Sequence, residues 1–309
     1  MEHMSDEVFA RFIAVLDDES FSEMRRIAGE RPLLPAEFET LPLPDGVTPE
    51  GGTMAQEVFK RYEKKYLLTQ EQYQKLMLIL GGVMDMDVYG HHTICNIYLD
   101  TPDYELIRTS IEKPVYKEKV RMRCYGARVN DSSPVFLELK KKYDSVVYKR
   151  RVGMDMETAR RYVCYGIHPG QDGQIFREVD YAVRRYGLRP MAYISYERDA
   201  YTCQMDRELR ITFDSSILGR LGDLDLRVEP YGKCLLPQEQ ILMEVKIPGA
   251  MPVWLSRIFA EQGIFPSAYS KYGTFYETYI YPARMTGYEE MAGYHTTRQE
   301  YMQGGIICA

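Results

Sequence analysis

The sequence lacks any apolar run long enough to cross a lipid bilayer. Its opening, MEHMSDEVFARF, also lacks the basic and then apolar layout of a secretory signal peptide. The six cysteines include no CxxC pair, so the sequence indicates neither a zinc site nor a redox dithiol. From these absences we expect a cytoplasmic protein that does not itself span a membrane.

The chain also lacks an overall excess of basic residues. Its 309 residues include 39 Lys and Arg against 45 Asp and Glu, which gives a formal net charge of -6. A protein that coats nucleic acid needs a surface that is basic throughout, so we predict no nucleic-acid partner. Any anion-binding site must therefore be a cluster of basic residues in one region of the protein.

What is present divides the chain into three segments. Residues 1–54 are predicted to hold a short helix and a linker, RPLLPAEFETLPLPDGVTPEGG, whose prolines prevent helix formation. Residues 55–283 are predicted to form one folded domain, and residues 284–309 a C-terminal tail. The folded domain therefore holds nearly all of the expected regular structure.

About eight long strands, with helices between and after them, are expected in this domain. The predicted strands cover residues 57–68, 88–100, 116–126, 134–142, 145–153, 191–202, 208–216 and 240–247. Helices are predicted from the capping box of Thr69 and Gln72 through Leu80, and over 103–112, 155–165, 174–187 and 251–282.

Strand parity separates charged from apolar side chains in most of these strands, because side chains two residues apart share a face. The charged faces carry Arg61, Glu63 and Lys65; Lys117, Lys119, Arg121 and Arg123; Glu138 and Lys140; Lys149 and Arg151; Tyr196 and Arg198; Arg210, Thr212 and Asp214; and Glu244 and Lys246. In one strand this pattern would indicate only a solvent-exposed face. Its recurrence in an acidic chain favours charged faces that enclose a common interior.

The predicted fold class is therefore α+β, with a closed eight-stranded antiparallel β-barrel tunnel and helices packed around it. About ten cations inside such a barrel would repel one another severely unless a polyanion balanced them. Phosphate chains suit this role, since Lys and Arg bind phosphate oxygens by charge-assisted hydrogen bonds. The few carboxylates, Glu63, Glu138 and Glu244, are candidate ligands of a divalent metal that bridges phosphates.

Eight motifs in order strengthen this interpretation: RYEKKYLL, IYLD, VRMRCYG, FLELKKK with VVYKRR, SYERDAY, LRITFD, LMEVKI and SAYSKYG. Together they resemble the catalytic domain of the vacuolar transporter chaperone (VTC) polyphosphate polymerases, which are CYTH-like triphosphate tunnel metalloenzymes. The resemblance covers roughly residues 55–280. It implies a metal-dependent ATP:polyphosphate phosphotransferase that uses Mn²⁺ or Mg²⁺, with ATP and polyphosphate or triphosphate as ligands and a membrane partner that takes up the chain.

The resemblance also implies roles for single residues. Those expected to bind nucleotide phosphates or the growing chain are Lys65, Arg121, Arg123, Lys140, Lys149, Arg198, Arg210 and Lys271. Tyr196 would help to position the phosphates, and Glu244 would bind the metal. Parity adds Arg61, Arg151 and Lys246 as phosphate-binding residues, and Glu63 and Glu138 as metal ligands.

Two departures from related sequence patterns bear on the choice between the polymerase and its alternatives, a binding module and a hydrolase. The family's closing motif commonly has a second lysine three residues before the position that matches Lys271, and here that position is Ala268. A non-catalytic module that binds polyphosphate or inositol phosphates would fit this difference. A tripolyphosphatase or nucleoside triphosphatase of the same fold usually has an ExExK first strand, whereas this strand offers only Glu63 between Arg61 and Lys65. That departure favours the polymerase.

Three assignments have a plainer alternative. Lys271 could be a single exposed lysine on an amphipathic helix, and Glu244 could form a structural ion pair with a neighbouring arginine. Tyr196 is one of 26 tyrosines, most of which must be packing residues, so its role rests on the resemblance alone.

Overall fold

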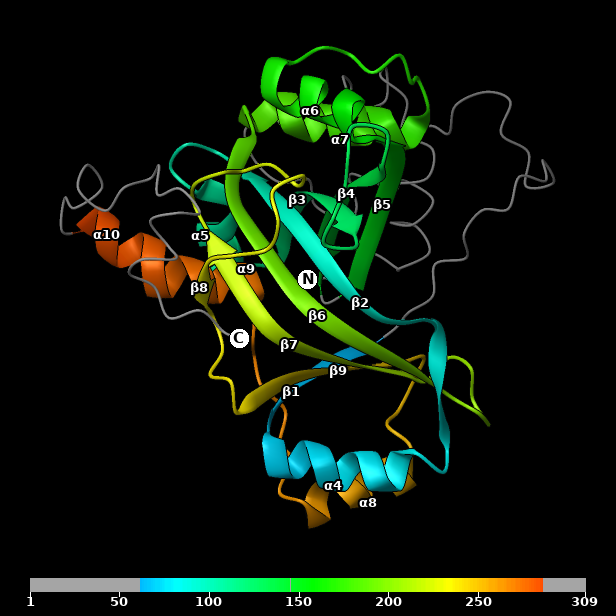
Figure 1. The fold of residues 1–309 in the computed structure, drawn as a ribbon. Helices are drawn as coiled ribbons and strands as arrows, with labels where there is room; N and C mark the ends of the chain where they lie inside the picture. The colour runs from blue at the N-terminus through cyan, green and yellow to red at the C-terminus, as the bar shows by residue number, and fades with distance from the viewer. Residues whose placement is uncertain (1–61, 145, 286–309) are drawn as a thin grey trace, which may run out of the picture. The chain divides into compact units, whose positions relative to one another are not determined.

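The computed structural model describes residues 62–144 and 146–285 (Figure 1). The predicted N-terminal helix and linker, Arg61, and the tail from residue 286 onward lie outside the described residues.

Nine strands in the described part of the chain form one sheet of antiparallel pairs. They are β1 (Tyr62–Thr69), β2 (Met84–Asp100), β3 (Tyr116–Tyr125), β4 (Pro134–Tyr143), β5 (Val146–Asp155), β6 (Arg189–Cys203), β7 (Arg210–Arg220), β8 (Lys233–Cys234) and β9 (Gln240–Ile247). Eight of them follow the order β1-β9-β7-β6-β2-β3-β4-β5, and the two-residue β8 pairs with β7. The long strands match those predicted from the sequence to within a few residues, with a first strand that is described only from Tyr62.

The predicted closed barrel is wrong. β1 and β5 are the two ends of the strand order, and no backbone pairing joins them within the described residues. The sheet is nevertheless strongly curled. The curling is evident from Lys140 Nζ of β4, which lies 3.8 Å from the Glu63 carboxylate of β1 although β9, β7, β6, β2 and β3 lie between these two strands in the strand order. Strand parity assigns residues to faces but carries no information on whether the end strands pair, so it could not separate a curled open sheet from a barrel.

Helices lie between and after the strands. They are α4 (Gln70–Leu80), α5 (Glu105–Ile111), α6 (Met156–Tyr165), α7 (Gln174–Tyr186), α8 (Val253–Glu261), α9 (Lys271–Phe275), the π-helical turn η1 (Tyr276–Ile280) and α10 (Tyr281–Met285). The capping box predicted at Thr69 and Gln72 is present at the start of α4. No helix in the described ranges combines the length and the apolar character needed to cross a membrane.

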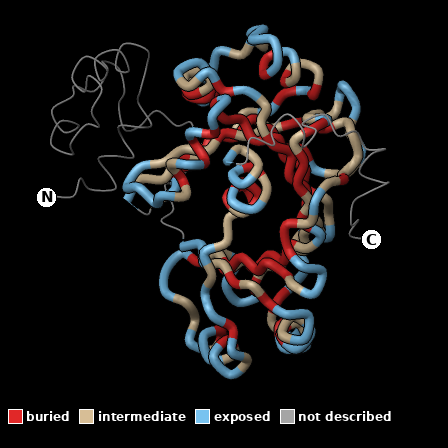
Figure 2. Tube along the Cα trace, turned by 90° about the vertical axis from the view of Figure 1, so that its left-hand side faces the viewer, coloured by how far each residue is buried: buried red, intermediate tan, exposed pale blue. Residues whose placement is uncertain are grey.

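Two helix pairs cover the apolar face of the sheet, which we call the outer face. α6 and α7 pack against β3, β4 and β5, where Val120, Leu137 and Val179 are fully buried. α4 and α8 cover β1 and β9, where Leu68, Val245 and Leu255 are fully buried. Figure 2 shows buried residues concentrated along the strands and exposed ones in the loops. The outer face therefore holds most of the core, which leaves the opposite, inner face to the charged residues.

α9 and η1 cover part of the inner face with apolar side chains. Tyr272 stacks on Tyr98 of β2 with the ring centroids 4.5 Å apart, and Phe275 packs in the same buried cluster as Ile194 of β6. Because Lys271 is the first residue of α9, this packing brings its side chain to the inner face.

The helical range predicted over 251–282 is interrupted in the structure. α8 ends at Glu261, Gly263 adopts a left-handed conformation with φ of 63°, and Pro266 forms a bridge to Tyr66 of β1 before α9 begins. Glycine tolerates this conformation without strain, and proline cannot continue a helix. The break carries the chain from the outer face to the inner one.

Asp100 fixes the position of α9. It is fully buried at the end of β2, and its carboxylate accepts hydrogen bonds from the backbone N–H groups of Leu106 and Ile107 in α5. It also accepts a hydrogen bond of 3.1 Å from the Tyr272 hydroxyl. One side chain thus joins β2, α5 and α9.

Replacing Asp100 by Ala should lower the free energy of unfolding by about 3 kcal/mol, since it leaves buried donors unsatisfied. Asp103→Ala in the same turn is the control: Asp103 is exposed, and its removal should cost less than about 1 kcal/mol. Urea unfolding measures both. Equal effects in the two variants would show that Asp100 does not anchor this region.

Candidate functional site

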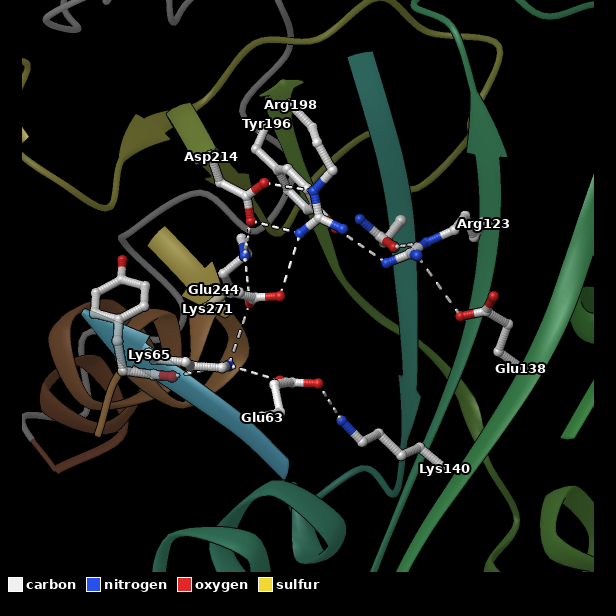
Figure 3. A network of polar contacts seen from close by, with 12 residues as sticks. Glu63, Lys65, Arg123, Glu138, Lys140, Tyr196, Arg198, Asp214, Glu244 and Lys271 are labelled. Carbon is white, nitrogen blue, oxygen red and sulfur yellow. Dashed lines mark hydrogen bonds and ion pairs between the residues drawn. The ribbon is translucent and has the colours of Figure 1, made fainter. Parts of the chain in front are cut away.

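Charged side chains from seven strands and α9 converge on the inner face of the curled sheet. Figure 3 shows residues of β1, β3, β4, β6, β7, β9 and α9 pointing toward one another there. Their ion pairs form two groups. The Asp214 group contains Asp214, Glu244, Lys65, Arg198 and Lys271; the Glu138 group contains Glu138, Arg121, Arg123, Lys149 and Arg151.

Asp214 of β7 is fully buried and contacts two cations. Arg198 Nε donates to Asp214 Oδ1 at 2.5 Å, and Lys271 Nζ donates to Asp214 Oδ2 at 2.5 Å. Burial alone would raise the pKa of Asp214, but the charges of Lys271 and Arg198 outweigh it and hold the pKa below its ordinary value. This carboxylate therefore stays ionised and holds both cations in place.

Glu244 of β9 lies beside the same cations with longer contacts. Lys65 Nζ and Lys271 Nζ each lie 3.4 Å from Glu244 Oε1, and Arg198 Nη2 lies 3.4 Å from Oε2. Burial opposes ionisation, yet the charges of Lys271, Lys65 and Arg198 hold the pKa of Glu244 well below its ordinary value. Glu244 is thus an ionised carboxylate whose hydrogen-bonding capacity is only loosely used.

Tyr196 of β6 supports these cations through its ring. Lys271 Nζ lies 4.3 Å from the ring centroid, and the Arg198 guanidinium carbon lies 5.1 Å from it. Both distances suit cation–π attraction. Lys271 is itself buried, so the alternative of an exposed helical lysine is wrong.

The Glu138 group lies on the other side of the inner face. Glu138 of β4 contacts Arg121 Nη2 at 2.7 Å, Lys149 Nζ at 2.7 Å and Arg151 Nη2 at 2.5 Å. Burial alone would raise the pKa of Glu138, but the charges of Arg121, Arg123 and Lys149 hold it far below its ordinary value. Burial lowers the pKa of Lys149 to about 8 in spite of its contact with Glu138.

Arg123 connects the two groups. It donates to Asn96 Oδ1 of β2 at 2.8 Å and to the Tyr196 hydroxyl at 3.0 Å, and its Nη1 lies 3.9 Å from Glu138. Asn96 is fully buried and donates in turn to the Ile194 carbonyl at 2.9 Å. The guanidinium is therefore held in one orientation.

The remaining predicted residues lie around these groups. Glu63 lies 3.8 Å from both Lys65 and Lys140, and Lys246 lies opposite Glu63 in the β1–β9 register. Arg210 is ion-paired with Asp87 of β2 and lies opposite Lys246 in the β7–β9 register. Most of the predicted phosphate-binding residues are therefore together, with Arg210 at the margin and Arg61 outside the described residues.

Sequence reasoning assigned no role to three residues that the structure places in the site. Asp214 and Lys119 were on the charged faces by parity, so that signal was available. Asn96 is one polar residue between Cys95 and Ile97 on an otherwise apolar strand, which is a weaker signal. Their importance follows from partners on distant strands, which parity does not identify.

The three predicted metal ligands differ in their fit to a divalent cation. Both oxygens of Glu138 are bound by cations at 2.7 Å or less, so the predicted metal role does not fit it. Glu244 has only loose contacts, and its charge acts on Glu63 nearby. The Thr212 hydroxyl, opposite Glu244 in the register, is buried without a hydrogen-bond partner in the described residues.

The described residues contain no cluster of three or more His, Cys, Asp or Glu side chains that could hold a metal by itself. Mg²⁺ bound to phosphates takes only one or two protein carboxylates and completes its shell with water and phosphate oxygens. Glu244 and Glu63, with the Thr212 hydroxyl, meet that smaller requirement.

A family model and a curated relative match this chain. The sequence model of a family described as "VTC domain" matches residues 60–280. Vacuolar transporter chaperone complex subunit 4 of Schizosaccharomyces pombe is 23% identical over 202 residues, which are 56% of this chain and 28% of the relative. The chain therefore matches little more than a quarter of that protein's length.

Two solved structures are similar to this chain at a low level. A candidate adenylate cyclase of Bacillus halodurans is 14% identical, with a TM-score of 0.43, over 68% of this chain and 95% of that protein. Another, from Vibrio parahaemolyticus, is 11% identical, with a TM-score of 0.39, over 70% of this chain and 97% of that protein. Likeness at this level supports no conclusion about the reaction.

Asp214→Asn should lower the free energy of unfolding by about 3–5 kcal/mol, because it leaves Arg198 and Lys271 buried with less compensating charge. Asp131→Asn is the control, since Asp131 is exposed in its ion pair with Arg227 and should matter by less than about 1 kcal/mol. Chemical unfolding at pH 7 distinguishes them. A stable Asp214→Asn protein would refute the idea that this carboxylate holds the site together.

Glu138→Gln should have a pH-dependent effect on stability. Folding lowers the pKa of Glu138. The contribution of this carboxylate to the free energy of unfolding is therefore fully present when the pH is above the ordinary pKa of 4.5, and it is lost as the pH falls below that value. The difference in unfolding free energy between wild type and variant should therefore be about 3 kcal/mol at pH 7 and should shrink toward pH 3. Urea titrations at both pH values measure it, and a difference that stays constant would contradict the assignment.

Proposed function

This chain belongs to the VTC domain family, and from that premise we propose that it lengthens polyphosphate with phosphate from ATP. The proposed reaction is a phosphotransfer on the inner face of the curled sheet. The observation that carries it is the convergence of at least seven Lys and Arg side chains on three buried carboxylates. Asp214, Glu138 and Glu244 hold these cations in place, and many of their N–H donors remain for a polyanion.

Phosphoryl transfer requires the side chains to align the donor and acceptor phosphates and to neutralise their charge, and little else. A terminal phosphate oxygen of the acceptor chain attacks the γ-phosphorus of ATP and forms the new P–O–P bond. The bond between the γ-phosphorus and the β,γ-bridging oxygen breaks, and ADP leaves with that electron pair. The attacking oxygen is already anionic, so no protein base is needed.

We assign the roles by position. Arg198 and Lys271 would bind phosphate next to Glu244, while Arg121, Arg123 and Lys149 would bind the neighbouring stretch of phosphate. Preorganised cations of this kind stabilise charge in the transition state without reorganisation cost. Glu244 and Glu63 would hold Mn²⁺ or Mg²⁺, which when bound would neutralise charge on the phosphates. Arg210 must exchange its contact with Asp87 for phosphate if it takes part.

Partners outside this chain are part of the proposal. The fission-yeast relative is named as a subunit of a complex, and we propose that this chain likewise delivers its product to a membrane partner. Cytoplasmic ATP would be the phosphate donor.

The direct test is to incubate the purified protein with ATP and Mn²⁺ or Mg²⁺ and to resolve ADP, free phosphate and long-chain polyphosphate. We expect chains and ADP in matching amounts. Free phosphate without chains would indicate a hydrolase, which agrees less well with a first strand that has Glu63 as its one carboxylate between Arg61 and Lys65. Unchanged ATP together with bound tripolyphosphate would indicate a binding module, and either result would refute the polymerase.

Glu244→Gln should reduce turnover about 100-fold or more, because it removes the charge proposed to hold the metal. Binding of tripolyphosphate without metal should persist in this variant, since the cations remain. Glu71→Gln is the matched control, because Glu71 is an exposed residue of α4 paired only with Lys75. Normal turnover in Glu244→Gln would rule out the proposed metal site.

A further inference from the structure

Lys119 of β3 occupies a place on the inner face that none of the assigned roles uses. It lies on the same face of β3 as Arg121 and opposite Lys140 in the β3–β4 register. Its ammonium group donates a hydrogen bond of 3.2 Å to the hydroxyl of Ser270, the residue just before Lys271. Lys119 therefore connects the middle of β3 to the segment that closes the inner face.

The charge around Lys119 differs from that around the other cations of the site. Arg121, Arg198 and Lys271 each contact at least one carboxylate. Lys119 contacts none within the described residues, and its only hydrogen-bond partner there is neutral. The largest electrostatic effects on it come from four cations: Lys65 of β1, Lys140 of β4, and Lys117 and Arg121 of its own strand.

A confined ammonium group among four cations is unfavourable unless an anion occupies the space beside it. The folded chain supplies carboxylates to the Asp214 group and to the Glu138 group, and Glu63 pairs with Lys65 and Lys140. No carboxylate of the described residues forms an ion pair with Lys119 itself. We propose that Lys119, held against Ser270, is an additional phosphate-binding subsite whose negative charge comes from the phosphate chain itself. This inference rests on the proposed function, since it assigns a further contact to the same polyanion.

The position of the subsite agrees with one irregularity of the sequence. The closing segment has Ala268 where the family pattern has a lysine. Lys119 brings a cation to the same segment from β3, at Ser270, two residues along the chain from Ala268. A strand thereby supplies the positive charge that the closing segment does not carry at Ala268.

The protonation of Lys119 should make phosphate binding at the subsite depend on pH. Burial and the surrounding cations lower its pKa to about 7 in the ligand-free protein. A bound phosphate favours the ammonium form, so binding above pH 7 requires proton uptake at Lys119. Affinity should therefore be highest below pH 7 and fall as the pH rises above it.

The test measures binding of inorganic tripolyphosphate by titration calorimetry without metal, at pH 6.5 and pH 8.5, for four proteins. They are the wild type, Lys119→Gln, Lys119→Arg and the control Lys75→Gln, which removes an exposed lysine of α4. At pH 6.5, Lys119→Gln should bind about tenfold more weakly than wild type, while Lys75→Gln should match it. Between pH 6.5 and 8.5, wild type should lose at least about fivefold more affinity than Lys119→Arg, because arginine remains protonated.

The outcomes separate this inference from the proposed function. If wild type binds and Lys119→Gln binds equally well, the subsite is refuted while the function stands. If Lys119→Gln binds weakly but wild type and Lys119→Arg share one pH dependence, the proton-linked subsite is also refuted. If wild type does not bind tripolyphosphate at all, the proposed function itself fails. Thermal unfolding of each variant confirms that weaker binding does not reflect unfolding.

Discussion

The structure depends on the balance between buried cations and a few buried carboxylates on one face of a curled sheet. Asp214 and Glu138 each hold two or more cations within 2.7 Å, and Glu244 lies 3.4 Å from Lys65, Arg198 and Lys271. Without those carboxylates, like charges would repel one another strongly in a region shielded from water. The cations outnumber these carboxylates, which is why we propose a polyanion as the ligand.

The fold creates this arrangement without closing the sheet. Packing of α4, α6, α7 and α8 on the outer face supplies the apolar core, so the inner face is not required to be apolar. Curling brings Lys140 of β4 within 3.8 Å of Glu63 of β1, and α9 inserts Lys271 from the far end of the domain. Residues more than 200 positions apart in the chain thus share one electrostatic environment, as the hydrogen bond from Lys65 to the Tyr269 carbonyl illustrates.

The sequence predicted which residues lie on the inner face better than it predicted how the strands and helices around that face are arranged. Parity placed Arg121, Glu138 and Arg198 correctly because alternation is a local property of a strand. It could not reveal the open edge between β1 and β5, or the break near Gly263 that delivers Lys271, since both depend on contacts between distant segments. Asp214 was on the predicted face, but its role as the partner of two cations emerged only from three-dimensional contacts.

The central claim is that a phosphate chain binds on the inner face of the sheet. A crystal structure of the protein with tripolyphosphate tests it most directly. We expect phosphate oxygens within hydrogen-bonding distance of Arg121, Arg198 and Lys271 in the same complex. Phosphate bound only on the outer face, for example at Lys141 and Arg150 beside Glu178, would contradict the account.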